Sequence, residues 1–154
     1  MRFEDLAVGQ HAEHAKTVTD ADVVLFAGVT GDFNPAHVDA EAAARSRFGG
    51  RIAHGMLSAG FISAAIGMRL PGPGSIYLGQ TLRFTAPVRI GDTITARVEV
   101  LELVPGKRRV KLSTVCRNQR GETVIDGEAT VLLPDDPPPP TPDAGRPATA
   151  APAA

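Results

Sequence analysis

The sequence predicts an α+β fold in which antiparallel strands pack against one long helix. Two observations predict this arrangement. Residues 55–70 form an apolar segment of helical length, and a Pro-Gly-Pro-Gly stop separates it from a series of strand-like segments that reaches residue 133. Residues 94–100 alternate strictly between apolar and polar side chains, which is typical of a strand with one packed and one solvated face. The apolar helix is the expected partner of the packed face.

Two shorter elements precede the long helix. Residues 11–18 are expected to form a first strand. Thr19 can accept a hydrogen bond as the N-cap of the helix that follows. The first turn of that helix carries Asp20 and Asp22, which favour the positive end of the helix dipole. Gly31 is expected to end the helix.

A turn separates this helix from the next. Asn34-Pro35 interrupts regular structure, because proline lacks an N–H, fixes φ and disfavours helical angles in the residue before it. Asp39 is then expected to cap a short helix over residues 40–46.

The long helix and the strands after it complete the domain. Gly55 to Leu70 is apolar on nearly all sides, so we expect it to be buried all round, with Met56 and Met68 as core residues. The remaining segments are expected to form one long antiparallel meander. Its strands are expected at residues 76–84, 93–100, 110–117 and 123–133, with turns at 105–106 and 120–121.

The length of 154 residues suits one domain, which we place at residues 1–133. The composition changes at Pro134, because eight of the 13 prolines lie from that residue onward among Ala, Asp and Thr. Without any apolar period, residues 134–154 are expected to form a flexible Pro/Ala-rich tail.

Charge and cysteine content exclude several classes of protein. A net charge of -1 gives no electrostatic footprint for nucleic acid or an acidic membrane surface. The apolar segment from Gly55 to Leu70 is shorter than the roughly 20 residues needed to span a bilayer. Cys116 is the only cysteine, and the first six residues include the acidic Glu4 and Asp5 where a secretory signal would have an apolar core. We therefore expect a cytoplasmic protein without nucleic-acid or membrane partners.

A carboxylate and an imidazole stand close together in the chain. Asp32 and His37 are five residues apart, and the Asn34-Pro35 turn between them lets both side chains converge on one point. Seventeen residues after His37, His54-Gly55-Met56 opens the long helix, whose first backbone N–H can stabilise a developing negative charge. The first group suggests proton transfer, and the second suggests an anion-stabilising donor.

These residues resemble a known family. Asp-Phe-Asn-Pro-x-His at residues 32–37, His-Gly-Met at 54–56 and the apolar helix after them are similar to the MaoC-like hot-dog proteins, above all the (R)-specific enoyl-CoA hydratases. The likeness runs from about residue 9 to residue 133 and includes Gly-Ser-Ile-Tyr-Leu-Gly-Gln at 74–80. It implies a hot-dog fold, a curved antiparallel sheet wrapped around one long helix, and a homodimer that acts on acyl-CoA thioesters without a cofactor.

The resemblance also implies roles for individual residues. It places the catalytic water on Asp32 and His37, and the thioester carbonyl on the backbone N–H of Gly55. It assigns Ser63 to the neighbourhood of that water, and Asn34 to positioning within the motif. The implied reaction is hydration of trans-2-enoyl-CoA to (R)-3-hydroxyacyl-CoA, or the reverse dehydration.

The chemistry of this reaction suits these residue types. Adding water to an α,β-unsaturated thioester needs a base for the water, an acid for C2 and a donor for the enolate oxygen. His37 and Asp32 can share the first two roles, each worth roughly 10²–10⁴-fold. The Gly55 N–H can fill the third role, worth about 10²–10³-fold. Because the pair sits on one turn, we expect syn addition, with His37 activating water and Asp32 relaying the proton.

Structural alternatives remain for several of these residues. Asp32 alone could form an Asx-turn with its own backbone. His54 is expected to fix the loop before the long helix. Ser63 could bond to the carbonyl four residues earlier instead of meeting substrate. We expect no metal site at Asp32, His37 and His54, because their spacing matches no familiar ligand set.

Three other functions stay open on the sequence. A 3-hydroxyacyl-[carrier protein] dehydratase of fatty-acid synthesis would use the same chemistry on another thioester. A hot-dog acyl-CoA thioesterase commonly carries a carboxylate on the central helix or its partner strand, and residues 55–70 hold no Asp or Glu. An inert acyl-binding subunit would have no need for both Asp32 and His37.

Overall fold

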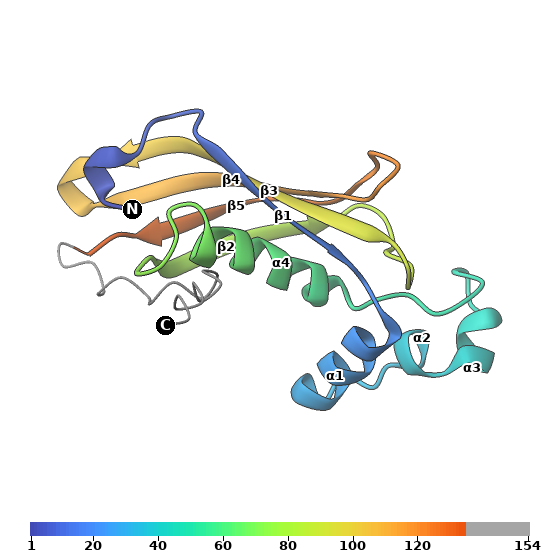
Figure 1. Cartoon of the computed structure of the whole chain (residues 1–154). Coiled ribbons are helices and arrows are strands. Elements are labelled where there is room, and N and C mark those ends of the chain that lie inside the picture. The colour runs from blue at the N-terminus through green and yellow to red at the C-terminus, as the bar shows by residue number, and fades with distance from the viewer. Residues whose placement is uncertain (135–154) are drawn as a thin grey trace, which may run out of the picture.

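A five-stranded antiparallel sheet curves over helix α4 (Gly55–Met68) in the computed structural model, which describes residues 1–134 (Figure 1). The helix packs against three of the strands, β1, β3 and β4. The five strands are β1 (His11–Thr17), β2 (Ile76–Phe84), β3 (Thr93–Val104), β4 (Arg109–Arg117) and β5 (Thr123–Leu132). The predicted α+β hot-dog fold is confirmed.

The strand order is β1-β3-β4-β5-β2, so only β3, β4 and β5 form a meander. β1 pairs with β3, and β2 pairs with β5 along the opposite edge of the sheet. The prediction of one long meander was therefore wrong for β2, which does not pair with the strand that follows it. Alternation within a strand fixes which side chains face the core, but it says nothing about which strand lies beside it.

The core lies between the sheet and α4. Buried side chains of β3 and β4 alternate with partly exposed ones, as the sequence pattern predicted. The expectation that α4 is buried all round was wrong, because Met56 is 55% exposed and Met68 72% exposed. Only the side of α4 that faces the sheet is buried, through residues such as Ile62 and Ile66.

Helix α1 (Asp20–Thr30) begins and ends where its capping residues predict. The Thr19 hydroxyl accepts a hydrogen bond from the N–H of Asp22, whose carboxylate accepts one in return from the Thr19 N–H at 2.8 Å. Hydrogen bonds from the Lys16 ammonium and from Thr19 lower the pKa of Asp22 to about 2. The chain leaves the helix through Gly31, whose φ of 79° is one that glycine adopts without strain.

The Asn34-Pro35 pair starts a helix rather than only interrupting one. Helix α2 (Pro35–Val38) has Asn34 as its N-cap and Pro35 at its first position, where the missing N–H costs nothing. Asp39 then caps α3 (Ala40–Ala44), as expected. All three short helices gather beyond the N-terminal end of α4 (Figure 1).

Two short 3-10 helices complete the described chain, η1 (Phe3–Asp5) and η2 (Pro105–Lys107). None of the helices within residues 1–134 is long and apolar enough to cross a membrane. The predicted tail, apart from Pro134, lies outside the described residues.

Candidate active site

The turn after α1 brings Asp32 and His37 together. A carboxylate oxygen of Asp32 and one ring nitrogen each of His37 and His54 lie within 4.8 Å of one another. The other contacts of the turn hold it in shape, since Asp32 Oδ1 accepts the Asn34 N–H at 3.2 Å and Asn34 Oδ1 accepts the Ala36 N–H at 3.1 Å. Asn34 thus fixes the segment between the two side chains, and its expected role as a positioning residue at the substrate site stays a prediction.

The hydrogen bonds of His37 determine which of its nitrogens can accept a proton. Nδ1 lies 2.9 Å from the backbone carbonyl oxygen of Ile52, and a carbonyl can only accept. Nδ1 therefore carries the hydrogen in the neutral ring, and Nε2 keeps its lone pair. This is the arrangement that a general base for water requires.

His54 holds the start of α4 against the Asp32 turn. It is 2% exposed, and its Nε2–H donates to the backbone carbonyl of Asp32 at 2.9 Å. Its ring centroid lies 3.8 Å from that of His37 and 4.9 Å from that of Phe26. The predicted structural role of His54 fits these contacts, but the sequence did not predict its hydrogen bond to Asp32, which lies 22 residues earlier in the chain.

A cavity of about 370 Å³ lies at the first turn of α4. We call it the helix-start cavity, and its wall includes His37, Gly55, Ser58, Phe84, Val124 and Ile125. Within residues 1–134 the N–H of Gly55 has no hydrogen-bond acceptor, as expected for the first residue of a helix. The cavity therefore combines the imidazole of His37 with an unpaired backbone donor.

Gly55 lies in close contact with an aromatic ring. A Cβ added at this position would lie 2.7 Å from Cε1 and 2.8 Å from Cδ1 of Phe84. Real Cβ atoms essentially never come so near another heavy atom, so a side chain at this position would force the half-exposed Phe84 ring to shift. Glycine keeps the N–H of the first turn open to an incoming ligand.

Ser63 lies on another face of α4. It is exposed and lines a second cavity of about 510 Å³ together with Tyr77 and Gln80. The structure therefore does not bring Ser63 into the cavity that holds His37 and Gly55, although Met56 lines both cavities. Its role in substrate binding stays a prediction.

Ser58 also lines the helix-start cavity, although the sequence did not predict it as a site residue. It is fully buried in the wall of the helix-start cavity, one turn after Gly55. The sequence could have indicated this position, because Ser58 follows Gly55 by three residues and residues three apart share a helix face. The sequence did not show which face of the helix borders the cavity.

Most of the chain is similar to proteins of one known family. The model of the MaoC like domain matches residues 5–124 of the chain. The chain belongs to the MaoC-like dehydratase family. It is 58% identical over 132 residues to an (R)-specific enoyl-CoA hydratase of Rhodospirillum rubrum, covering 86% of this chain and 91% of that protein.

Two further relatives of this MaoC-like protein bear on its fold and its substrate. The unliganded R-hydratase PhaJ1 of Pseudomonas aeruginosa superposes with a TM-score of 0.86 at 48% identity, over 97% of this chain and 96% of that one. A mitochondrial 3-hydroxyacyl-[acyl-carrier-protein] dehydratase of Solanum lycopersicum is 41% identical, over 84% of this chain and 78% of that protein.

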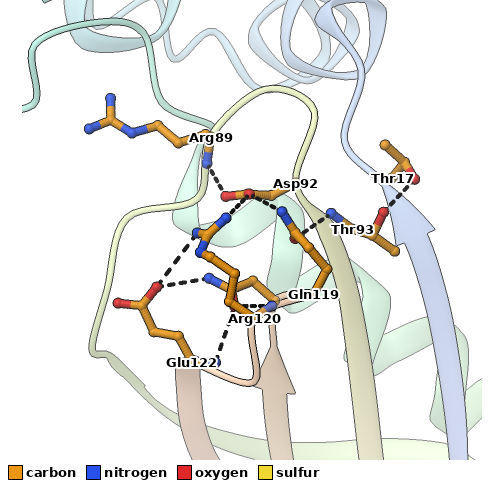
Figure 2. Close-up of polar contacts among 8 residues, drawn as sticks. Thr17, Arg89, Asp92, Thr93, Gln119, Arg120 and Glu122 are labelled. Carbon is orange, nitrogen blue, oxygen red and sulfur yellow. Dashed lines mark hydrogen bonds and ion pairs between the residues drawn. The ribbon is translucent and has the colours of Figure 1, made fainter.

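A polar cluster holds the loop before β3 of the MaoC-like domain. The buried Asp92 accepts hydrogen bonds from the N–H of Arg89 at 2.9 Å and from the side chains of Gln119 at 2.7 Å and Arg120 at 2.9 Å (Figure 2). Burial raises the pKa of Asp92, but hydrogen bonds from Arg120, Arg89 and Gln119 outweigh it and keep the pKa below its usual value. The loop ahead of β3 is thereby fixed to the turn between β4 and β5.

Arg89 connects this polar cluster to the segment that forms part of the cavity wall. Its guanidinium donates to the backbone carbonyl oxygens of Phe48 and Gly50, and its backbone forms an antiparallel bridge with Ile52. Ile52 is the residue whose carbonyl oxygen accepts from His37 Nδ1. The orientation of the His37 ring thus depends on a segment held in place from the sheet.

Asp32, His37 and His54 form the only cluster within residues 1–134 whose side chains are near enough together to hold a metal ion. Each imidazole already has one nitrogen committed to a backbone carbonyl. The centroids of the two rings lie 3.8 Å apart, with an angle of 33° between the ring planes. The expectation of no metal at this cluster stays a prediction.

Proposed function

We propose that the protein is a hydro-lyase that adds water to trans-2-enoyl-CoA and forms (R)-3-hydroxyacyl-CoA, or reverses this reaction. The observation that carries the proposal is that the side chains of Asp32 and His37 lie close together beside the helix-start cavity, which Gly55 also lines. The names of the R. rubrum and P. aeruginosa relatives support the (R) configuration and the class of reaction. Such an activity places the protein in fatty-acid metabolism.

The pair supplies both proton transfers. A water held between the Asp32 carboxylate and His37 Nε2 loses a proton to His37 as its oxygen attacks C3. The electron pair of the C2–C3 double bond moves toward the thioester carbonyl and leaves an enolate. The proton passes through Asp32 to C2, which forms the new C–H bond and returns the pair to its starting state. Because both groups lie on one turn, water and proton reach the same face.

The N–H of Gly55 stabilises the enolate oxygen. It is unpaired within the described residues and stands at the positive end of the α4 dipole. A preorganised donor at this point acts on charge that develops only in the transition state, which is why one such donor is worth about 10²–10³-fold. Gly55 has no Cβ of its own, so the only side chain at this point is the Phe84 ring that packs against it.

The assay that tests this function is the loss of enoyl-thioester absorbance when purified protein is mixed with crotonyl-CoA. We expect turnover, with 3-hydroxybutyryl-CoA as the product and no free thiol released. Release of CoA thiol would indicate a thioesterase instead, and an unchanged crotonyl-CoA signal would contradict the hydratase proposal.

A dehydratase that acts on carrier-protein thioesters is the second candidate. The observation in its favour is the 41% identity to the S. lycopersicum protein named for that substrate. The chemistry at Asp32 and His37 is the same for both thioesters, so only the carrier differs. Rates on crotonyl-CoA and on the crotonyl-carrier-protein thioester, compared at equal concentration, distinguish the two candidates.

We infer that the protein is a homodimer. β2 is an edge strand, and it leaves the large apolar side chains of Ile76, Leu78 and Phe84 about half exposed. Met56 and Met68 add to this apolar surface from α4. Edge strands and exposed apolar surface of this kind are normally covered. Light scattering at micromolar concentration is expected to give the mass of two chains, and the mass of one chain would contradict the inference.

A cytoplasmic location and a single domain over residues 1–133 remain part of the proposal. Burial raises the pKa of the Cys116 thiol to about 12, so this cysteine stays a thiol in the folded protein. With one cysteine the chain can form no intrachain disulfide, which fits a reducing compartment. Recovery of the native protein outside the cell would contradict the location. A variant truncated after Leu133 that lost hydration activity would contradict the domain boundary.

A further inference from the structure

Ser58 carries a buried hydroxyl without a partner. The residue is 0% exposed, and within residues 1–134 its Oγ makes no hydrogen bond. It lines the helix-start cavity, as His37 and Gly55 do. A buried hydroxyl without a hydrogen bond costs free energy, so each instance in a folded protein calls for an explanation.

The wall of the cavity is mostly apolar, with side chains such as Ala53, Val88, Val124 and Ile125. Its other polar side chains are His37, Arg47 and Thr85, and within residues 1–134 none of these three hydrogen bonds to Ser58 Oγ. On the sheet side, the backbone carbonyl oxygen of Ser58 lies 3.8 Å from Sγ of Cys116, and this contact leaves the hydroxyl free. A polar atom that enters the cavity with a ligand is therefore the natural partner of Ser58 Oγ.

The geometry of the helix places this hydroxyl next to the donor already described. Side chains on an α-helix lean toward its N-terminus, so the side chain of Ser58 covers the turn that begins at Gly55. Gly55 has no side chain, and the Phe84 ring packs where its Cβ would lie. Gly55 and Ser58 thus line the same cavity one turn apart, on one face of α4.

We propose that Ser58 is a second hydrogen-bond donor to the thioester carbonyl oxygen and acts together with the N–H of Gly55. This inference rests on the proposed hydratase function. The enolate oxygen accepts both hydrogen bonds, and Ser58 keeps its proton throughout the reaction. The hydroxyl is unpaired in the free protein and becomes paired when charge develops on the substrate.

If Ser58 had only a structural role, removing its hydroxyl would change stability in the direction opposite to the one that our proposal predicts. His54 Nδ1 is also buried and unpaired within the described residues, and it lies four residues before Ser58. If the hydroxyl donated to this nitrogen in solution, its removal would destabilise the fold. If it is unpaired in the free protein, as we propose, its removal stabilises the fold.

The test is Ser58→Ala, compared with the wild-type chain by crotonyl-CoA hydration and by thermal unfolding. We expect kcat to fall about 10- to 100-fold with KM changed less than about twofold, because the donor acts on charge formed in the transition state. We expect Tm to rise by about 2–5 °C. The matched control is Ser113→Ala, on the solvated face of β4, which should leave kcat unchanged.

Each remaining outcome decides the proposal. An S58A variant with wild-type kcat would overturn it, as would one whose Tm falls while kcat follows the loss of folded protein. If the wild-type chain itself fails to hydrate crotonyl-CoA, the hydratase function fails first, which is a separate result. The combination of a higher Tm and a lower kcat supports the proposal, because a merely structural hydroxyl would not produce it.

Discussion

Replacing Asp32 by asparagine is expected to lower kcat for crotonyl-CoA hydration about 10³-fold while the fold persists. Asparagine keeps a side-chain oxygen at the position where Asp32 Oδ1 accepts the Asn34 N–H, so the turn retains its hydrogen bond. It loses the negative charge and the ability to carry a proton to C2. The measurement is steady-state kinetics, with circular dichroism to verify the fold.

His37→Asn completes this test as a double-mutant cycle. The asparagine amide can still donate to the Ile52 carbonyl oxygen, as Nδ1 does, but it offers no basic nitrogen. Because Asp32 and His37 act on one water, the double variant should be little slower than the slower single variant. Multiplication of the two single effects, or near-normal turnover by Asp32→Asn, would show that the residues do not share one proton path.

Gly55→Ala is expected to lower kcat about 10²-fold, the effect of losing one preorganised donor. The new Cβ would lie 2.7 Å from the Phe84 ring, and the displaced ring and the methyl group together would obstruct the approach of the carbonyl to the helix N-terminus. Circular dichroism and thermal unfolding of the variant verify that the loss does not arise from unfolding.

Gly67→Ala on the same helix is the matched control for this substitution. A Cβ at Gly67 meets no heavy atom within 4 Å, so the methyl group should raise Tm slightly and leave kcat unchanged. If Gly55→Ala hydrates crotonyl-CoA at the wild-type rate, the Gly55 N–H does not stabilise the enolate.

Features encoded by neighbouring residues could be predicted from the sequence. Thr19 and Gly31 bound α1 because capping depends on only a few adjacent groups. The strand interiors followed from period-two alternation, with Cys116 correctly placed inward. The convergence of Asp32 and His37 could be predicted for the same reason, because a five-residue turn determines it.

Features that depend on contacts between distant parts of the chain could not be predicted from the sequence. The pairing of β2 with β5 joins segments some 50 residues apart, and no local pattern encodes that choice. The apolar composition of α4 suggested complete burial, but Met56 and Met68 belong to a surface for which we propose a second chain as cover. Ser58 and Ser63 look alike in the sequence, and only the packing of α4 against the sheet shows that Ser58 lines the same cavity as His37 while Ser63 lines another.

Coupling across the site had no sequence signal either. His54 reaches the Asp32 carbonyl, and Arg89 reaches the loop that carries Ile52, through contacts that depend on the complete fold. In the sequence alone, neither residue belongs to a pattern that distinguishes it from an ordinary loop residue. Their contacts fix the catalytic turn against α4, so the geometry of Asp32 and His37 relies on residues outside the motif.

The stereochemistry of hydration in D₂O tests most directly whether one turn delivers both water and proton. Crotonyl-CoA is converted by the wild-type chain, and NMR of the 3-hydroxybutyryl-CoA gives the configuration at C3 and the position of deuterium at C2. The account predicts the (R)-alcohol with deuterium and hydroxyl added to the same face. An (S)-product, addition to opposite faces or a mixture of both would contradict it.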